Sequence, residues 1–349
     1  MSSFLSDASK LLVRNIELFQ GKRCLLMNNP ADQFGRELSA TASAVYSYNY
    51  HFGYHQQLTS QLPSDHCHFG VELPQDWANF DAIIIYWPKE KSLASYLVQH
   101  VLNHCQSDAM VYCIGPNKEG IRSAASIAKS IGIKSNKLDA AKHCSLFGLP
   151  VASIDDAISP LSIESQQKTF SVEWQQQHIQ LVTVPGVFSA NHLDDGTALL
   201  LNSLPDDLGE QVLDFGCGCG IVATALAHQQ TKRDVYAVDV NAFALYATQQ
   251  TLAANQLSAT VYPVTGVNDI TQNQLSAIVT NPPFHQGVKT HYQVTEDLIR
   301  LAPQKLNRNG QLVAVANRFL QYPELLAAAF KDNQRLNQTS KFVVYQSRS

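Results

Sequence analysis

The chain has 349 residues, of which 45% are hydrophobic, and a net charge of −4. This length suits about two domains of ~100–200 residues each. Neither half is basic, since residues 1–175 carry 14 basic and 16 acidic side chains and the remainder 11 and 13. The balance argues against a dedicated nucleic-acid-binding protein and leaves RNA contact to local patches. The sequence shows no membrane-spanning run and no secretion signal, so a cytoplasmic protein, without membrane contact, is expected.

The first half of the chain contains apolar runs with the length of buried strands. They are Cys24–Met27, Phe80–Trp87 and Met110–Ile114. The segments Asn28-Asn29-Pro30-Ala31 and Pro88-Lys89 follow the first two runs and have the composition of turns. This half is therefore predicted to be an α/β domain.

A less regular stretch, residues 149–184, separates the halves. Pro150, Pro160 and the polar run 175–178 indicate a linker. Its later part alternates enough over 170–174 and 179–184 to predict a short hairpin. The predicted regions are thus 1–148, 149–184 and 185–349.

The third region begins with a segment that suits a carboxylate ligand. Gly196 and Thr197 follow two aspartates and precede an apolar helix predicted over Ala198–Leu201. Free backbone N–H groups at a helix start favour anions. Both residues are candidates for the carboxylate of a methionine-like cofactor, and an N-cap role is the equal alternative for Thr197.

A glycine-rich loop follows the strand predicted over Val212–Phe215. It contains Gly216, Gly218 and Gly220, and it leads into a helix of small residues over Ile221–His228. Glycines let a backbone approach a ligand closely. The intervening Cys217 and Cys219 have no second ligand pair at zinc spacing, so we predict no metal site.

Two acidic residues border this loop. Asp239 ends the next predicted strand, ~20 residues further on, which is the spacing of a carboxylate that holds ribose hydroxyls. Dinucleotide dehydrogenases use the same arrangement. Asp214 before the first glycine, and the Gly-x-Gly-x-Gly spacing, favour S-adenosylmethionine instead.

The segment Asn281-Pro282-Pro283-Phe284 provides what methylation of a planar amine requires. Such an amine reacts when acceptors hold its N–H groups and direct its lone pair. Asn281 offers a side-chain carbonyl, Pro282 a backbone carbonyl held by fixed φ angles, and Phe284 a face for stacking a flat base. Because ligands of open α/β sheets bind at the carboxyl ends of strands, Asp214, Asp239 and Asn281 are expected to converge. Together the motifs favour an S-adenosylmethionine-dependent methyltransferase.

The two halves show a similar spacing of their strand patterns. Leu25 and Ile84 lie 59 positions apart, and Leu213 and Val279 lie 66 apart. This similarity predicts an internal duplication. The first copy has neither the glycine loop nor the amine-holding step, so it is predicted to be a scaffold or recognition domain. An unrelated α/β domain is the alternative.

With these motifs, the chain resembles the RsmC family of bacterial ribosomal RNA methyltransferases over nearly its whole length. The most specific pieces are Tyr86–Lys89, Pro185–Ser189, Val212–Gly218 and Asn281–His285 with Gly287. The resemblance implies two tandem Rossmann-like class I methyltransferase domains, the N-terminal one degenerate. It also implies methylation of guanine N2 at position 1207 of 16S rRNA in the 30S subunit. We expect a monomer.

The resemblance implies that Asp214, Gly216, Gly218 and Asp239 bind the cofactor and that residues 281–284 form the active centre. The sequence departs from the family at Gln286, where Asp is usual, and at Gly266, where Asn or Asp meets the adenine. Val267 is assigned to the cofactor site, and the adenine contact stays open between a backbone amide and Asn268.

RNA contact is assigned to four residues: His285, Lys289, Arg318 and Lys89. Ordinary solvated charges, or for His285 a structural role, are the alternatives. Three other functions stay open. They are guanine-N2 methylation of large-subunit rRNA, protein glutamine methylation, and non-catalytic RNA binding or chaperoning. Phe284 argues against the second, since that class has Tyr there, and the intact glycine loop argues against the third.

Overall fold

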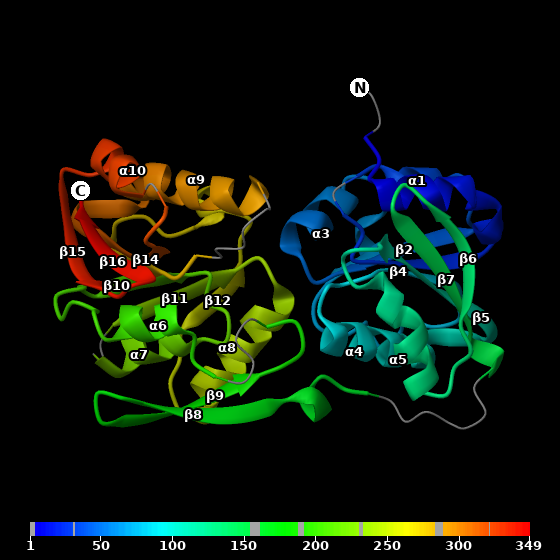
Figure 1. Cartoon of the computed structure of the whole chain (residues 1–349), viewed down its shortest axis with the longest axis horizontal. Coiled ribbons are helices and arrows are strands. Elements are labelled where there is room, and N and C mark those ends of the chain that lie inside the picture. Colours follow the sequence, from blue (N-terminus) through cyan, green and yellow to red (C-terminus); the bar gives the residue numbers. More distant parts are fainter. Residues whose placement is uncertain are drawn as a thin grey trace. The chain divides into compact units, whose positions relative to one another are not determined.

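Two compact units make up the chain, Met1–Gln166 and Gln167–Ser349, so the division falls within the stretch predicted as a linker. The structure is a computed structural model that describes residues 4–30, 32–153, 161–187, 192–229, 233–282, 289–320 and 322–349 (Figure 1). Each unit contains a seven-stranded sheet. Within the described ranges, every helix is too short or too polar to cross a bilayer.

The sheet of the first unit has the strand order β3-β2-β1-β4-β5-β7-β6. The strands β1 to β5 are parallel and β7 is antiparallel to both of its neighbours. The strands are β1 (Arg23–Met27), β2 (Ala44–Asn49), β3 (Cys67–Phe69), β4 (Phe80–Tyr86), β5 (Cys105–Pro116), β6 (Asn136–Ala141) and β7 (Cys144–Pro150). The helices are α1 (Asp7–Arg14), α2 (Phe34–Ser39), α3 (Phe52–Leu58), α4 (Lys91–Val101) and α5 (Ala124–Ser130).

The second unit repeats this order as β12-β11-β10-β13-β14-β16-β15. Its sheet strands are β10 (Gln211–Phe215), β11 (Asp234–Asp239), β12 (Thr260–Pro263), β13 (Leu275–Thr280), β14 (Leu306–Asn317), β15 (Asp332–Gln338) and β16 (Phe342–Arg348). Its helices are α6 (Asp195–Leu201), α7 (Ile221–Gln229), α8 (Ala242–Ala254), α9 (Lys289–Lys305) and α10 (Tyr322–Ala329). An antiparallel hairpin, β8 (Lys168–Trp174) and β9 (Gln177–Thr183), precedes them.

The hairpin is attached to the helices of the second unit. The Val182 amide donates to Thr251 Oγ1 of α8 at 2.9 Å, and Trp174 Nε1 donates to the Leu201 carbonyl at 3.1 Å. Trp174 is 5% exposed. The hairpin therefore packs as part of this unit, as β8 and β9 below α8 in Figure 1 indicate.

Burial explains why the central strands of the second unit form. β10, β11 and β13 lie between parallel neighbours, and their aliphatic residues are buried, with Val212, Leu213 and Ile278 fully so. Such strands read as continuous apolar runs rather than as alternating ones. The apolar core of this sheet continues onto α9 and α10 through Leu298, Leu326 and others. This core fixes the strand ends from which the candidate site residues project.

Strand register confirms the predicted duplication and shows which residues correspond. Leu25 of β1 pairs with Ile83 of β4, and Leu213 of β10 pairs with Ile278 of β13. Counting on from these pairs, Leu26 corresponds to Asp214, Asn28 to Gly216 and Tyr86 to Asn281. The β1–β2 and β10–β11 registers likewise match Asn49 with Asp239.

The first copy has therefore exchanged both acidic positions of the predicted cofactor site. Leu26, fully buried, replaces Asp214, and Asn49 donates its amide to Ser47 Oγ at 2.8 Å where the second copy has a carboxylate. The turn itself persists, because Asn28 has a φ of 51° and Gly216 one of 80°. The first copy thus keeps a residue with positive φ at the start of the turn and lacks both acids.

Candidate active site

The glycine-rich loop joins β10 to α7 and has two open positions and one packed position. Gly216, Gly218 and Gly220 have φ values of 80°, 56° and 84°, which favour glycine. A Cβ at Gly216 or Gly218 would meet no atom within 4 Å. A Cβ at Gly220 would lie 2.8 Å from Thr248 Cα of α8. The first two glycines thus leave room beside the loop, whereas the third lets α8 approach it.

The cysteines of the loop are buried. Cys217 Sγ accepts a hydrogen bond from Thr248 Oγ1 at 3.2 Å, and burial raises the pKa of Cys219 to about 11. A buried thiol with a raised pKa is a poor nucleophile or metal ligand. In the described ranges, no group of three or more His, Cys, Asp or Glu side chains could hold a metal ion.

Asp214 is a buried acid behind this loop. Its side chain is 1% exposed, and Oδ2 accepts a hydrogen bond from the Ala223 amide of α7 at 3.0 Å. Burial raises its pKa to about 8, and the nearby Asp239 charge adds to the shift. The sequence predicts only a ligand-binding role for this acid, and its contact with the start of α7 shows that it also fixes that helix.

Asp239 lies at the end of the neighbouring strand and is partly exposed. Its Oδ2 accepts from the Gly218 amide at 3.1 Å and its Oδ1 from the Asn241 amide at 2.9 Å. Burial raises its pKa as well. Two adjacent acids with raised pKa values favour a bound cation, because positive charge stabilises their ionised forms.

Asn281 follows β13. Because β10 pairs with β11 on one side and with β13 on the other, Asp214, Asp239 and Asn281 lie at adjacent strand ends. Its Nδ2 donates to Asp194 Oδ2 at 2.9 Å and to Thr197 Oγ1 at 2.7 Å. No donor to Asn281 Oδ1 occurs in the part of the chain that the structure describes. The use of this carbonyl oxygen as an acceptor for a substrate amine stays a prediction.

Asp194 is the N-cap of α6, and the sequence analysis did not assign it a role. Its Oδ2 accepts from the Thr197 amide at 2.9 Å. Thr197 therefore lies inside the first turn, so the N-cap alternative for it is wrong. A helix start with Asp three residues before Thr was the available signal.

Some of the remaining predicted residues are buried, one is exposed, and others lie outside the described residues. Gly196 is buried, and a Cβ there would lie 3.2 Å from Asp194 Oδ2 and 3.3 Å from Phe342 Cε1. Pro282 and Val267 are also buried, and Asn268 is exposed. Pro283, Phe284 and His285 lie outside the described residues, as does the side chain of Lys289. Binding of the methionine carboxylate and of adenine by these residues stays a prediction.

Arg318 and Lys89 are exposed and belong to different units. Lys89 Nζ lies 3.6 Å from Glu119 Oε1. That distance describes an ordinary surface ion pair, so nothing local distinguishes Lys89 as an RNA contact.

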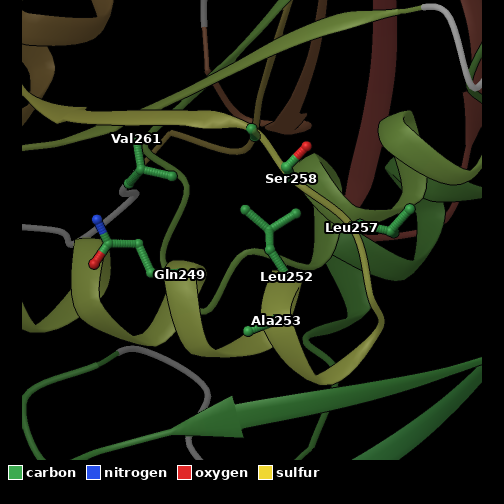
Figure 2. Close-up of a pocket in the computed structure, with 7 residues that line it drawn as sticks. Gln249, Leu252, Ala253, Leu257, Ser258 and Val261 are labelled. Carbon is green, nitrogen blue, oxygen red and sulfur yellow. The ribbon is translucent and has the colours of Figure 1, made fainter.

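A small pocket of about 170 Å³ lies elsewhere in the second unit. Figure 2 shows its lining side chains, which come from α8, from β12 and from the segment between them and include Gln249, Leu252 and Val261. Since it lies where β12 begins, it is at the edge of the sheet opposite to the carboxyl ends that carry Asp239. It also lacks charged residues and is smaller than typical ligand pockets of ≈ 300–1,000 Å³.

Comparisons with known proteins match both units. The family described as "Methyltransferase small domain N-terminal" matches residues 9–170, and "Methyltransferase small domain" matches residues 178–346. Ribosomal RNA small subunit methyltransferase C of Aliivibrio salmonicida is 35% identical, covering 97% of this chain and 98% of the relative. The protein of the same name from Acinetobacter baumannii (strain AYE) is 38% identical, covering 93% and 94%.

A solved structure shares the whole fold. It is a T. thermophilus 16S rRNA N2 G1207 methyltransferase, RsmC, in complex with AdoMet and guanosine. The TM-score is 0.81 at 22% identity, and the match covers 100% of this chain and 93% of the other. At that identity the likeness shows the fold, while the closer sequence relatives show the family. The chain belongs to the ribosomal RNA small subunit methyltransferase C family.

Proposed function

We propose that this protein transfers a methyl group from S-adenosylmethionine to the N2 amine of the guanine at position 1207 of 16S rRNA. The relatives named for the small ribosomal subunit support the RNA, and the guanosine complex named above supports the base. The assembled 30S subunit as substrate, a cytoplasmic location and a monomeric enzyme are parts of the same proposal.

The observation that carries the proposal is the geometry of Asn281. Both hydrogen bonds of its Nδ2 go to the protein, to Asp194 and Thr197, which leaves Oδ1 to accept an N–H from a substrate amine. Pro282 adds a second acceptor through its backbone carbonyl. Two acceptors on one planar amine direct its lone pair, and such positioning supplies much of the acceleration of a bimolecular transfer.

The residues present also fit the cofactor. Gly216 and Gly218 leave open space beside the loop, and Asp214 and Asp239 present two acids with raised pKa values that a cation would stabilise. We assign Asp239 to the ribose hydroxyls and Asp214 to the side of the positively charged methionine moiety. When bound, S-adenosylmethionine supplies an electrophilic methyl on a sulfonium, which leaves as a neutral thioether.

In this mechanism the guanine amine attacks in its neutral form and loses its proton afterwards. Asn281 and Pro282 hold the amine, and the base must be unstacked from the RNA before it reaches them. Phe284 is proposed to stack on the base, and His285 to accept the released proton or contact a phosphate. Arg318, Lys289 and Lys89 are proposed RNA contacts.

The domain boundaries form part of the proposal. Residues 185–349 are the catalytic domain, 149–184 a linker with its hairpin, and 1–148 a scaffold that contributes to RNA recognition. Replacement of Asp214 and Asp239 by Leu26 and Asn49 in the first copy supports this division of labour, because no carboxylate stands at either position.

Isotope transfer from labelled S-adenosylmethionine tests the proposal. The wild-type protein is incubated separately with free 16S rRNA, 30S subunits and 50S subunits from cells that lack the enzyme. Label in the 30S subunit, mapped to N2 at position 1207, is expected. Label in 50S subunits would instead indicate a large-subunit enzyme, and no label in any RNA would indicate a binding protein.

The variant Asn281→Ala tests the amine-holding step. Turnover is expected to fall by at least about 100-fold, because one of two acceptors is removed. The dissociation constant for S-adenosylmethionine, measured by calorimetry, should change less than about threefold. Full turnover by Asn281→Ala would remove the proposed mechanism.

A further inference from the structure

We infer that Asp194 is a positioning residue that fixes which end of the Asn281 amide faces the substrate. The inference rests on the proposed function, because it concerns the acceptor that holds the guanine amine. Neither Asp194 nor its link to Asn281 was visible as a catalytic motif in the sequence. The structure places Asp194 at the start of α6, and Asn281 lies beyond the end of β13, 87 positions later in the chain.

The hydrogen bonds around Asp194 have a fixed direction. Its Oδ2 receives the Thr197 amide at 2.9 Å, the Thr197 hydroxyl at 3.1 Å and Asn281 Nδ2 at 2.9 Å. A carboxylate accepts hydrogen bonds and donates none. The Thr197 hydroxyl donates its only proton to Asp194. It therefore acts as an acceptor toward Asn281 Nδ2, at 2.7 Å. Both neighbours therefore select the NH2 end of the Asn281 amide.

This selection matters because an amide presents opposite chemistry at its two ends. With Nδ2 turned toward Asp194, Oδ1 is left to accept from the substrate. A flipped amide would present its own N–H groups to the N–H groups of the guanine amine. Two donors facing one another cannot hydrogen-bond, and the lone pair of the amine would lose its alignment.

The first copy of the duplicated fold contains a counterpart of this network in which the side chain of the N-cap residue carries no charge. Ser6 is the N-cap of α1, and its Oγ accepts from the Ser9 amide at 3.1 Å. Ser9 Oγ in turn lies 2.6 Å from Tyr86 OH, and Tyr86 corresponds to Asn281 by strand register. Ser6, Ser9 and Tyr86 thus occupy the roles of Asp194, Thr197 and Asn281.

Comparing the two copies distinguishes two roles of Asp194, capping the helix and orienting the Asn281 amide. In the first copy the side-chain links from the helix start to the strand end are made by three hydroxyl groups, which donate or accept in either direction. The carboxylate of Asp32 also lies there, but it accepts from the backbone amide of Ser6, at 3.0 Å. The side-chain links themselves therefore do not require a carboxylate at the N-cap position. In the second copy Asp194 is an acceptor only, so it fixes the orientation of the Asn281 amide. The first copy has Tyr86 at this position and no amide to orient.

Two substitutions of Asp194 test the inference by steady-state methylation of 30S subunits that lack the modification. Asp194→Ser reproduces the cap of the first copy, and Asp194→Asn keeps the size of the side chain. Asp194→Ser is expected to lower kcat by about 100-fold, because a hydroxyl can donate or accept and no longer holds the Asn281 amide in one orientation. Asp194→Asn keeps one acceptor oxygen for the same three donors and should retain more activity than Asp194→Ser. The dissociation constant for S-adenosylmethionine and the melting temperature should stay close to the wild-type values.

The neighbouring substitution Asp195→Asn is the matched control. Asp195 lies in the same helical turn, its side chain is 78% exposed, and it is 4.0 Å from Lys341. It removes the same charge without touching Asn281, so its kcat should equal that of the wild type. In addition, Thr197→Ser, which keeps the second acceptor, should retain more activity than Thr197→Val.

The outcomes distinguish the inference from the proposed function. If the wild type methylates 30S subunits and Asn281→Ala does not, the function stands and the Asp194 variants decide the inference alone. Wild-type kcat in Asp194→Ser would overturn it. The inference would also be overturned if the loss of activity in the Asp194 variants were matched by a lower melting temperature or by weaker binding of S-adenosylmethionine. Asp194 would then be a structural helix cap only. Transfer by Asn281→Ala at the wild-type rate would instead overturn the function.

Discussion

Alanine substitution at Gly216 and at Gly220 should separate cofactor binding from stability within one loop. Both glycines have positive φ values, 80° and 84°, so alanine costs about 1–2 kcal/mol of backbone strain at each. The surroundings differ. Gly216 would place its Cβ in open space, whereas at Gly220 the new Cβ lies 2.8 Å from Thr248 Cα and 3.0 Å from Thr248 Cγ2.

The contact of the new Cβ at Gly220 with Thr248 Cα makes the loss of stability larger at Gly220 than at Gly216. Thr248 Cα belongs to the backbone of α8, so the helix itself must move, and overpacking of this kind costs typically 1–3 kcal/mol. The free energy of unfolding of the second unit should therefore fall by about 1–2 kcal/mol in Gly216→Ala and by about 2–5 kcal/mol in Gly220→Ala. The methyl group of Gly216→Ala projects into the space assigned to the cofactor, and its S-adenosylmethionine affinity should fall by on the order of 10–100-fold.

Hydrogen exchange read by mass spectrometry measures the stability part, because peptides from β10 and α7 report on the second unit separately from the first. Calorimetric titration with S-adenosylmethionine measures the binding part. Equal losses of stability in the two variants, or unchanged donor affinity in Gly216→Ala, would refute the assignment of an open and a packed face to this loop.

The acid behind the loop predicts a pH dependence. The raised pKa of Asp214, about 8, means that the folded protein binds a proton that the unfolded chain releases near pH 4, so its stability falls as pH rises between these values. Asp214→Asn should therefore gain up to ~4 kcal/mol relative to the wild type between pH 5 and pH 8 in urea denaturation without donor, and parallel pH curves would contradict this. Substitution of Arg233 should lower the stability of the fold without a direct effect on the site. Arg233 is 8% exposed and donates to the carbonyls of Gly209 and Leu226 at 2.9 and 3.1 Å. Arg233→Ala should cost about 2–4 kcal/mol, whereas the exposed Arg308→Ala should stay within about 0.5 kcal/mol by the same denaturation assay, and similar effects of the two would contradict the reasoning.

Much of the fold was predictable because its central strands are buried on both faces. The runs Cys24–Met27 and Val212–Phe215 became β1 and β10 within one residue at their ends, and the duplication inferred from their spacing is confirmed by the sheet order. The antiparallel strands at the edges were not predicted. β15 (Asp332–Gln338) is largely exposed and polar, so its sequence carries no apolar period to recognise.

The candidate site was predictable where the residue type itself indicates the backbone conformation, as with the glycines of the loop. It was less predictable where one side chain has both a structural role and a role in the site. Asp214 holds α7 through the Ala223 amide as well as facing the loop, and Asp194 is at once a helix cap and a partner of Asn281. Their contacts span 9 and 87 positions, respectively, and the second is a tertiary contact that no local pattern encodes.

The two copies together show how a duplicated domain separates folding from chemistry. The copies share strand order, strand register and the positive φ at the first turn, so these features belong to the scaffold. Among the positions at which they differ, three lie at the strand ends, where Leu26, Asn49 and Tyr86 stand in place of Asp214, Asp239 and Asn281. Each of these replacements removes a charge or an amide, while the strands pair in the same register. Because both copies have the same strand order, the acids and the amide of the second copy are not required for this topology. Asp214 also holds the start of α7 through the Ala223 amide, and the proposed methyl-transfer chemistry gives a reason for the presence of all three side chains together.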